Sequence, residues 1–157
     1  LQECAFADRD SQVAPGTTYK ILNQLLPDIS EIAHPRDLSE GQRLCLVLAI
    51  VLAAAPKLLI LDEPTRGLDY SAKLRLIKIL RSMANEGRSV ILATHDVELV
   101  AEVATRVVFL AEGEKIADGS TLDILTSSPA FAPQISKILA PGKWLTFSEI
   151  TSALEQN

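Results

Sequence analysis

The amino-acid sequence predicts an α/β protein whose strands form a parallel sheet. Two short apolar segments, residues 58–61 and 89–94, have the length and composition of buried strands. Between them, residues 71–86 repeat apolar side chains at helical spacing. A strand, a helix and a second strand in this order are typical of a parallel α/β layer with right-handed crossovers.

The first 37 residues are predicted to be mostly helical. Four residues make a short amphipathic face at helical spacing: Ile21, Leu22, Leu25 and Leu26. Pro15-Gly16 separates this helix from an earlier short one, and Pro27 ends it. Residues 34–37 are expected to form an extended linker, with His34 as a structural or solvent-facing histidine.

An apolar helix is predicted over residues 44–55, directly after Leu38-Ser39-Glu40-Gly41-Gln42-Arg43. Ser39 suits the N-cap position, and Gln42 three residues later completes a capping box. A capped helix N-terminus also presents unpaired N–H groups and a positive dipole, which favour a phosphate. Structural capping and anion binding can therefore share these residues.

Two acids, Asp62 and Glu63, follow the first predicted strand at once, and Pro64 then stops the strand. The carboxyl edge of the sheet in open α/β folds is where ligands bind. In phosphoryl-transfer sites such an Asp holds Mg²⁺ and a neighbouring acid orients or deprotonates the attacking water. The alternative interpretation is that both are cap or loop acids.

The helix over residues 71–86 is expected to turn four apolar residues inward, and Gly87 is expected to end it. These inward residues are Leu74, Ile77, Leu80 and Met83. The second strand also stops at polar residues, His95 and Asp96. Both predicted strands therefore end in side chains capable of chemistry.

The remainder of the chain is predicted to contain a hairpin and several short helices. A short helix over residues 97–104 precedes strands at 107–110 and 115–117, joined by a tight turn at Glu112-Gly113. Helices are expected at 122–125, 132–139 and 147–154. Trp144 and Phe147 are expected to pack these helices onto the domain.

Composition limits the classes of function. The chain has 157 residues and a formal net charge of −5, which argues against a general nucleic-acid binder. Its longest apolar run is too short for the roughly 20 residues that a membrane span needs. Cys4 and Cys45 are interpreted as reduced thiols of a cytoplasmic protein. The N-terminal residues lack an initiating Met, so we expect a segment that begins inside an element.

Taken together, these motifs resemble the ATP-binding-cassette (ABC) ATPase family over most of the chain. The signature segment, Leu38 to Gln42, resembles the motif L-S-G-G-Q, and Leu58 to Glu63 resembles the Walker B strand with its catalytic Glu. The D-loop, Gly67-Leu68-Asp69, and the switch histidine, His95, complete the family's order. Pro64 to Gly67 and Phe131 to Gln134 are most similar to energy-coupling-factor importers of cobalt or vitamins.

The resemblance implies a fold and a role for each of these residues. The fold would be a partial P-loop NTPase (RecA-like) parallel sheet with flanking helices and part of the ABC helical subdomain. The implied site residues are Asp62 for Mg²⁺ through water, Glu63 and His95 for catalysis, Ser39, Gly41 and Gln42 for the ATP of the opposite subunit, and Asp69 for coupling across the dimer.

The family comparison also predicts three parts within the chain and a set of partners. Residues 1–43 would belong to the helical signature subdomain, 44–119 to the ATPase core and 120–157 to a C-terminal helical extension. ATP and Mg²⁺ are the implied cofactors. A second ABC ATPase subunit and transmembrane permease subunits are the implied partners, with no nucleic acid, at the inner face of the cell membrane.

Two departures from the family stand out. Glu40 occupies a position where the family usually has Gly, close to where a triphosphate would dock, and we expect its side chain to point away. No G-x-x-x-x-G-K-[S/T] phosphate loop occurs in the 157 residues. The chain therefore resembles the C-terminal half of a nucleotide-binding domain, and alone it is expected to be nearly inactive.

The leading hypothesis is the C-terminal part of an ATP-hydrolysing subunit that drives import of a metal ion or vitamin. Two alternatives stay open at this point. The chain could be a non-catalytic interaction module, or part of a soluble ABC ATPase that is not linked to transport.

Overall fold

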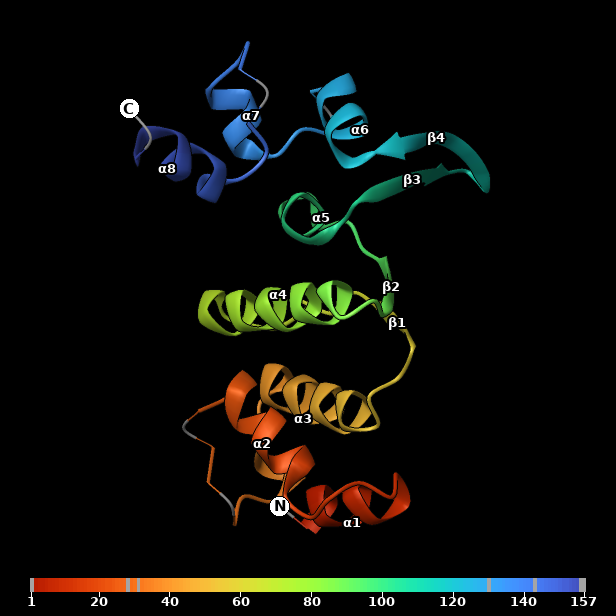
Figure 1. The fold of residues 1–157 in the computed structure, drawn as a ribbon, viewed down its shortest axis with the longest axis vertical. Coiled ribbons are helices and arrows are strands. Elements are labelled where there is room, and N and C mark those ends of the chain that lie inside the picture. Colours follow the sequence, from red (N-terminus) through yellow and green to blue (C-terminus); the bar gives the residue numbers. More distant parts are fainter. Residues whose placement is uncertain (1, 28, 31, 130, 143, 156–157) are drawn as a thin grey trace. The chain divides into compact units, whose positions relative to one another are not determined.

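A computed structural model describes residues 2–27, 29–30, 32–129, 131–142 and 144–155 (Figure 1). The chain divides into two compact units, Leu1–Ala93 and Thr94–Asn157, and each is described by itself. The three-part division at residues 43 and 119 remains a prediction, because these units reflect packing and not role.

The first unit begins with three packed helices, α1 (Gln2–Asp10), α2 (Thr17–Leu25) and α3 (Glu40–Ala53). Figure 1 shows them in red to yellow-orange, beside one another. Leu22 and Leu25 of α2 are completely buried, as the amphipathic spacing predicts, and Leu48 of α3 is 2% exposed. Removal of these leucines from water is the main stabilising contribution to this layer.

A buried carboxylate joins α1 to the start of α2. Asp8 is 2% exposed. Its oxygens accept hydrogen bonds from the Thr18 hydroxyl at 2.6 Å, the Thr18 amide at 2.8 Å and the Gly16 amide at 2.6 Å. Gly16 has no side chain to cap α2, so Asp8 satisfies these N-terminal amides from the neighbouring helix. The Thr18 hydroxyl is the main cause of a pKa of Asp8 below its ordinary value of 3.8.

We expect Asp8→Asn to lower the free energy of unfolding by about 1–3 kcal/mol at neutral pH, because charged hydrogen bonds to buried amides are lost. A lowered folded-state pKa contributes stability above pH 3.8 that is lost as pH falls through the folded value. The difference between the two proteins should therefore shrink below about pH 4. Urea unfolding at several pH values measures it, with exposed Asp10→Asn on the same helix as control. An equal loss of stability at pH 3 and pH 7 would contradict the ionic role.

The linker before α3 differs from the prediction. Residues Pro35–Asp37 form a 3-10 turn and not an extended segment. His34 caps this turn, since its Nδ1 accepts a hydrogen bond from the Arg36 amide at 3.1 Å. The proline ring presets the backbone angle that the first position of such a turn needs. His34 is solvent-facing, as predicted.

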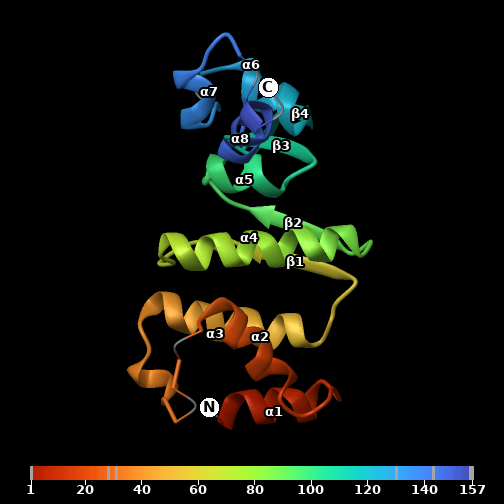
Figure 2. The same ribbon diagram turned by 60° about the vertical axis from the view of Figure 1, so that its left-hand side comes forward.

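The two predicted parallel strands are present in the first unit. β1 (Leu58–Asp62) pairs in parallel with β2 (Ser89–Ala93), with Leu58 opposite Ser89 and Asp62 opposite Ala93. The connecting helix α4 (Tyr70–Asn85) lies alongside both strands in Figure 2 and contacts β2. Gly87 follows α4 with φ +81°, and its amide donates to the Ala84 carbonyl, which confirms the predicted helix end.

Two details of this layer were predicted wrongly. The strands are not buried on both faces: Leu59 is buried, whereas Ile60 is 65% exposed and Ile91 is 53% exposed. In α4, Leu76 is fully buried and Leu74 is 39% exposed, because the true inward stripe begins at Ala72. Ile77, Leu80 and Met83 are buried as predicted.

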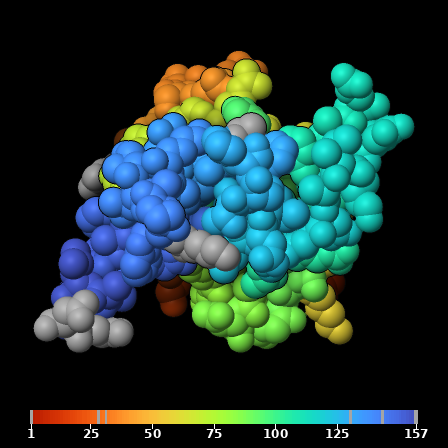
Figure 3. Space-filling view, turned by 90° about the horizontal axis from the view of Figure 1, so that it is seen from above, coloured from red at the N-terminus to blue at the C-terminus, as the bar shows by residue number. Residues whose placement is uncertain are grey.

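The second unit contains a β-hairpin between short helices. α5 (Val97–Val103) leads into β3 (Arg106–Ala111), which pairs antiparallel with β4 (Glu114–Ser120). Glu112 and Gly113 both have positive φ, as the predicted tight turn requires. This turn is exposed, and the hairpin is visible at the surface in teal in Figure 3.

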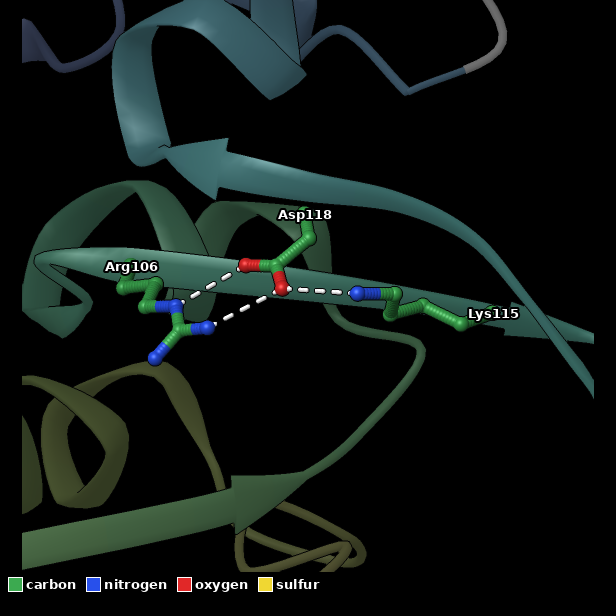
Figure 4. A network of polar contacts seen from close by, with 3 residues as sticks. All are labelled: Arg106, Lys115 and Asp118. Carbon is green, nitrogen blue, oxygen red and sulfur yellow. Dashed lines mark hydrogen bonds and ion pairs between the residues drawn. The ribbon is translucent and has the colours of Figure 1, made fainter.

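An ion-pair network joins the two strands of the hairpin (Figure 4). Arg106 contacts both carboxylate oxygens of Asp118, at 2.9 and 3.0 Å, and Lys115 contacts one of them at 3.2 Å. The hydrogen bond from Arg106 is the main cause of a pKa of Asp118 of about 2. The fork-shaped contact fixes the relative position of the two strands near Arg106.

Three helices follow the hairpin: α6 (Thr121–Ser127), α7 (Gln134–Ile138) and α8 (Phe147–Glu155). Phe131 packs on Phe109 of β3 with ring centroids 4.2 Å apart. The start of α8 carries a capping box, in which Thr146 accepts from the Glu149 amide and Glu149 accepts from the Thr146 amide. Phe147 was expected to pack but is 72% exposed.

Candidate functional site at the end of the first strand

The end of β1 carries the two predicted acids in different backbone conformations. Asp62 is the last residue of the strand and is exposed. Glu63 is half-buried and has φ +46°, a left-handed conformation that is uncommon for a residue with a side chain. The Glu63 amide donates to the Ala93 carbonyl at 2.8 Å, which ties this residue to the end of β2. Strained backbone of this kind gathers at functional sites.

A compact turn connects Glu63 to α4. The Arg66 amide donates to the Glu63 carbonyl at 3.1 Å, and the Leu68 amide donates to the Thr65 carbonyl at 3.1 Å. The turn ends at Asp69, whose carboxylate caps α4 by accepting from the Ala72 amide at 2.7 Å. One carboxylate oxygen of the predicted D-loop acid is thus engaged within its own chain.

The N-terminus of α3 has the predicted capping box. The Gln42 amide donates to the Ser39 hydroxyl at 3.2 Å, and the Ser39 amide donates to the Gln42 side-chain oxygen at 2.9 Å. Ser39 is exposed and Gln42 is half-buried. The capping box therefore fixes where α3 begins, and the positive end of the helix dipole lies at the surface.

The structure brings the signature segment and the D-loop together through two glycines. Gly41 is buried, and a Cβ atom at this position would collide with the Gly67 carbonyl oxygen. Gly67 itself has φ +74°, which favours glycine. The backbones of the start of α3 and of the turn after β1 therefore contact each other here, and we call this the joined surface. Five predicted site residues belong to these two segments: Ser39, Gly41, Gln42, Glu63 and Asp69.

Another predicted site residue, His95, belongs to the second unit. It is exposed and follows the end of β2 by two residues. The next residue, Asp96, caps α5 by accepting from the Leu99 amide at 3.0 Å. The contact of His95 with the γ-phosphate of ATP stays a prediction.

The chemistry of the acids fits Mg²⁺ only when a phosphate shares the ion. Within the described ranges no three His, Cys, Asp or Glu side chains gather as a metal site. Mg²⁺ is usually held by one or two carboxylates together with waters and substrate phosphates. Asp62 alone, exposed at the end of a strand, suits this arrangement.

Comparison with known proteins places this chain in a family. The family model described as "AAA domain, putative AbiEii toxin, Type IV TA system" matches residues 8–101, more than half of the chain. The chain belongs to this family of AAA domains. Curated relatives named as ABC transporter ATP-binding proteins and solved ABC cassettes are similar to this chain.

The relatives come from several bacteria and archaea. A "Putative ABC transporter ATP-binding protein" of Streptomyces coelicolor is 62% identical over 97% of this chain. A protein of the same name from Streptomyces avermitilis is 57% identical over 97% of the chain. The chain spans only 27% of the length of each of these two relatives.

Solved structures support the fold. The "Structure of ATP binding subunit of ABC transporter" matches 87% of this chain and 59% of its own, with a TM-score of 0.68 and 20% identity. A dimeric ATP-binding cassette in a post-hydrolysis state, bound to ADP and Pi, matches 66% of this chain and 45% of its own. Its TM-score is 0.58 and its identity 23%. The α/β prediction with a parallel sheet and flanking helices is therefore confirmed.

Sequence reasoning missed one contact at the site. Arg66 lies beside Glu40, with its Nε 3.5 Å from the Glu40 carboxylate. The two opposite charges are 26 positions apart, so no local spacing rule connects them.

In the described part of the chain no helix has the length and apolar character to cross a membrane.

Proposed function

We propose that the chain forms part of an ABC transporter ATP-binding subunit and contributes the water-activating and signature residues of its ATPase site. The phosphate loop would come from sequence outside these 157 residues. The observation that carries the proposal is the joined surface of α3 and the turn after β1, with Glu63 held in a left-handed conformation.

The chemistry of each residue supports a role in this proposal. Asp62 would share Mg²⁺ with the nucleotide phosphates and water, and the ion would offset negative charge on them. Glu63, tied to Ala93, would orient and deprotonate the attacking water. His95 would donate a hydrogen bond to the transferred phosphate.

The signature segment and the D-loop would act on a second subunit and not on the nucleotide of their own. Ser39, Gly41 and Gln42 would present the N-terminus of α3 to the ATP of that subunit. Asp69 would cross the dimer interface. The dimeric state named for a solved cassette of the same fold supports a second ATPase subunit as partner.

The exposed sheet supports a missing neighbour for β1 and β2. Leu58, Ile60 and Ile91 are about half exposed or more, and both strands have an unpaired edge within the described sheet. Apolar strand faces of this kind normally pack against further structure. We propose that the phosphate-loop half of the domain covers them.

The transporter context is also a proposal. The names of the Streptomyces relatives support permease subunits as partners and a position at the inner face of the membrane. Import of a metal ion or vitamin by an energy-coupling-factor system rests on the similarity of Pro64 to Gly67 and Phe131 to Gln134. The substrate would be selected by the membrane subunits.

The test is a chimera in which this chain replaces the matching 62% identical stretch of the Streptomyces coelicolor relative. We expect Mg²⁺-dependent ATP hydrolysis by the chimera, with the relative itself as the positive control. The 157-residue chain alone should be at least about 100-fold slower, because phosphate-cradling groups are absent from it. A folded but inactive chimera beside an active relative would contradict the proposal, as would equal turnover by the chain alone.

A further inference from the structure

The charge at the start of α3 is matched by a charge on the turn after β1. Glu40 is the first residue of α3, and its Oε1 lies 3.5 Å from the Nε of Arg66. The side chains of Glu40 and Arg66 are largely exposed, at 68% and 79%. An ion pair this exposed adds little to folding stability. The main effect of the pair is therefore on the electrostatic potential that a ligand meets at this surface.

Backbone packing brings these two side chains together. Gly41 lies directly against the Gly67 carbonyl, so neighbouring Glu40 and Arg66 are carried on two segments in contact. The Glu40 side chain runs over Gly67, since a Cβ at Gly67 would lie 3.5 Å from its Cγ. The Glu40 carboxylate is therefore directed toward the turn that contains Arg66.

The position of Glu40 matters because of what the start of α3 offers a ligand. The first turn of a helix presents free amides and a positive dipole to an anion. A carboxylate in that turn opposes an incoming phosphate by Coulomb repulsion. Arg66 supplies the opposite charge at the same place.

We propose that Arg66 is a positioning residue for nucleotide binding, which holds the Glu40 carboxylate over Gly67 and offsets its charge. The start of α3 then remains open to the phosphates of ATP. This inference rests on the proposed function, in which the signature segment meets ATP. It accounts for an acid at a position where the ABC family usually has Gly.

The test is a double-mutant cycle in the Streptomyces chimera, with ATP turnover measured over a range of ATP concentrations. Arg66→Ala is expected to raise the KM for ATP about fivefold, the size of effect that a solvent-screened charge produces, with kcat within about twofold of the parent. Arg66→Lys should restore most of the affinity. In the Glu40→Gln background, Arg66→Ala should leave KM nearly unchanged, because the charge it offsets is gone.

Control measurements separate this role from others. Arg9→Ala, at an exposed arginine of α1, should not change KM. The urea midpoint of the Arg66→Ala variant of the 157-residue chain should match that of the parent. If Arg66→Ala raised KM equally in the parent and in the Glu40→Gln background, the inference would be overturned, since Arg66 would then contact ATP itself. An unchanged KM in Arg66→Ala would overturn the inference too. So would a rise in KM accompanied by a lower urea midpoint, since the effect would then come from lost stability. An inactive parent chimera would instead refute the proposed function.

Discussion

Glu63→Gln in the Streptomyces chimera should reduce kcat for ATP hydrolysis by about 10²–10⁴-fold, the contribution of a positioned general base. The amide has nearly the same shape as the carboxylate but cannot accept the proton of the attacking water. ATP affinity should stay within about threefold of the parent, because binding depends on other groups. Steady-state turnover and titration with a fluorescent ATP analogue measure the two quantities separately.

The chain contains a closely matched control for this substitution. Glu112 also has a left-handed backbone, with φ +52° against +46° at Glu63, and lies in the exposed hairpin turn. Glu112→Gln repeats the same chemical change under the same backbone constraint and should leave kcat unaltered. Parent-like turnover by the Glu63→Gln protein would show that Glu63 is not the base.

The second large effect is expected from Gly41→Ala. The added Cβ would clash with the Gly67 carbonyl oxygen, so α3 and the turn after β1 must separate. Overpacking of this kind costs about 1–3 kcal/mol, measurable in the 157-residue chain by urea unfolding. In the chimera, turnover should fall by at least about 100-fold, because a displacement of about 1 Å in positioning groups can have that effect.

Gly119→Ala provides the matched comparison. Gly119 is in β4, and a Cβ there would meet only the flexible end of the Ile124 side chain at 3.4 Å. We expect little change in stability or turnover from it. If Gly41→Ala behaved in the same way, the contact between Gly41 and Gly67 would not be what aligns the two segments.

Local patterns in the sequence predicted the elements well because each depends on nearby residues. The Ser39 and Gln42 capping box, the end of α4 at Gly87 and the tight turn at Glu112-Gly113 are all formed within a few residues. The parallel pairing of β1 and β2 followed from the strand, helix, strand order. The inward stripe of α4 was misplaced at Leu74, where tertiary packing selects Leu76 instead.

The site was predicted as a list of residues but not as an arrangement. Sequence spacing placed Asp62 and Glu63 at the end of a strand, but the left-handed conformation of Glu63 arises from its hydrogen bond to Ala93 and from the turn that follows. The Glu40 and Arg66 contact depends on two glycines meeting across the fold. Such tertiary contacts leave no periodic trace in a single sequence.

The left-handed backbone at Glu63 sets the stability of the fold against the catalytic role proposed for this residue. Glycine would occupy φ +46° without the steric cost that glutamate carries there. Selection for a more robust fold alone would favour loss of this side chain, whereas selection for turnover would retain it. Variants of this protein selected only for heat resistance would then tend to replace Glu63, and they would be more stable but inactive.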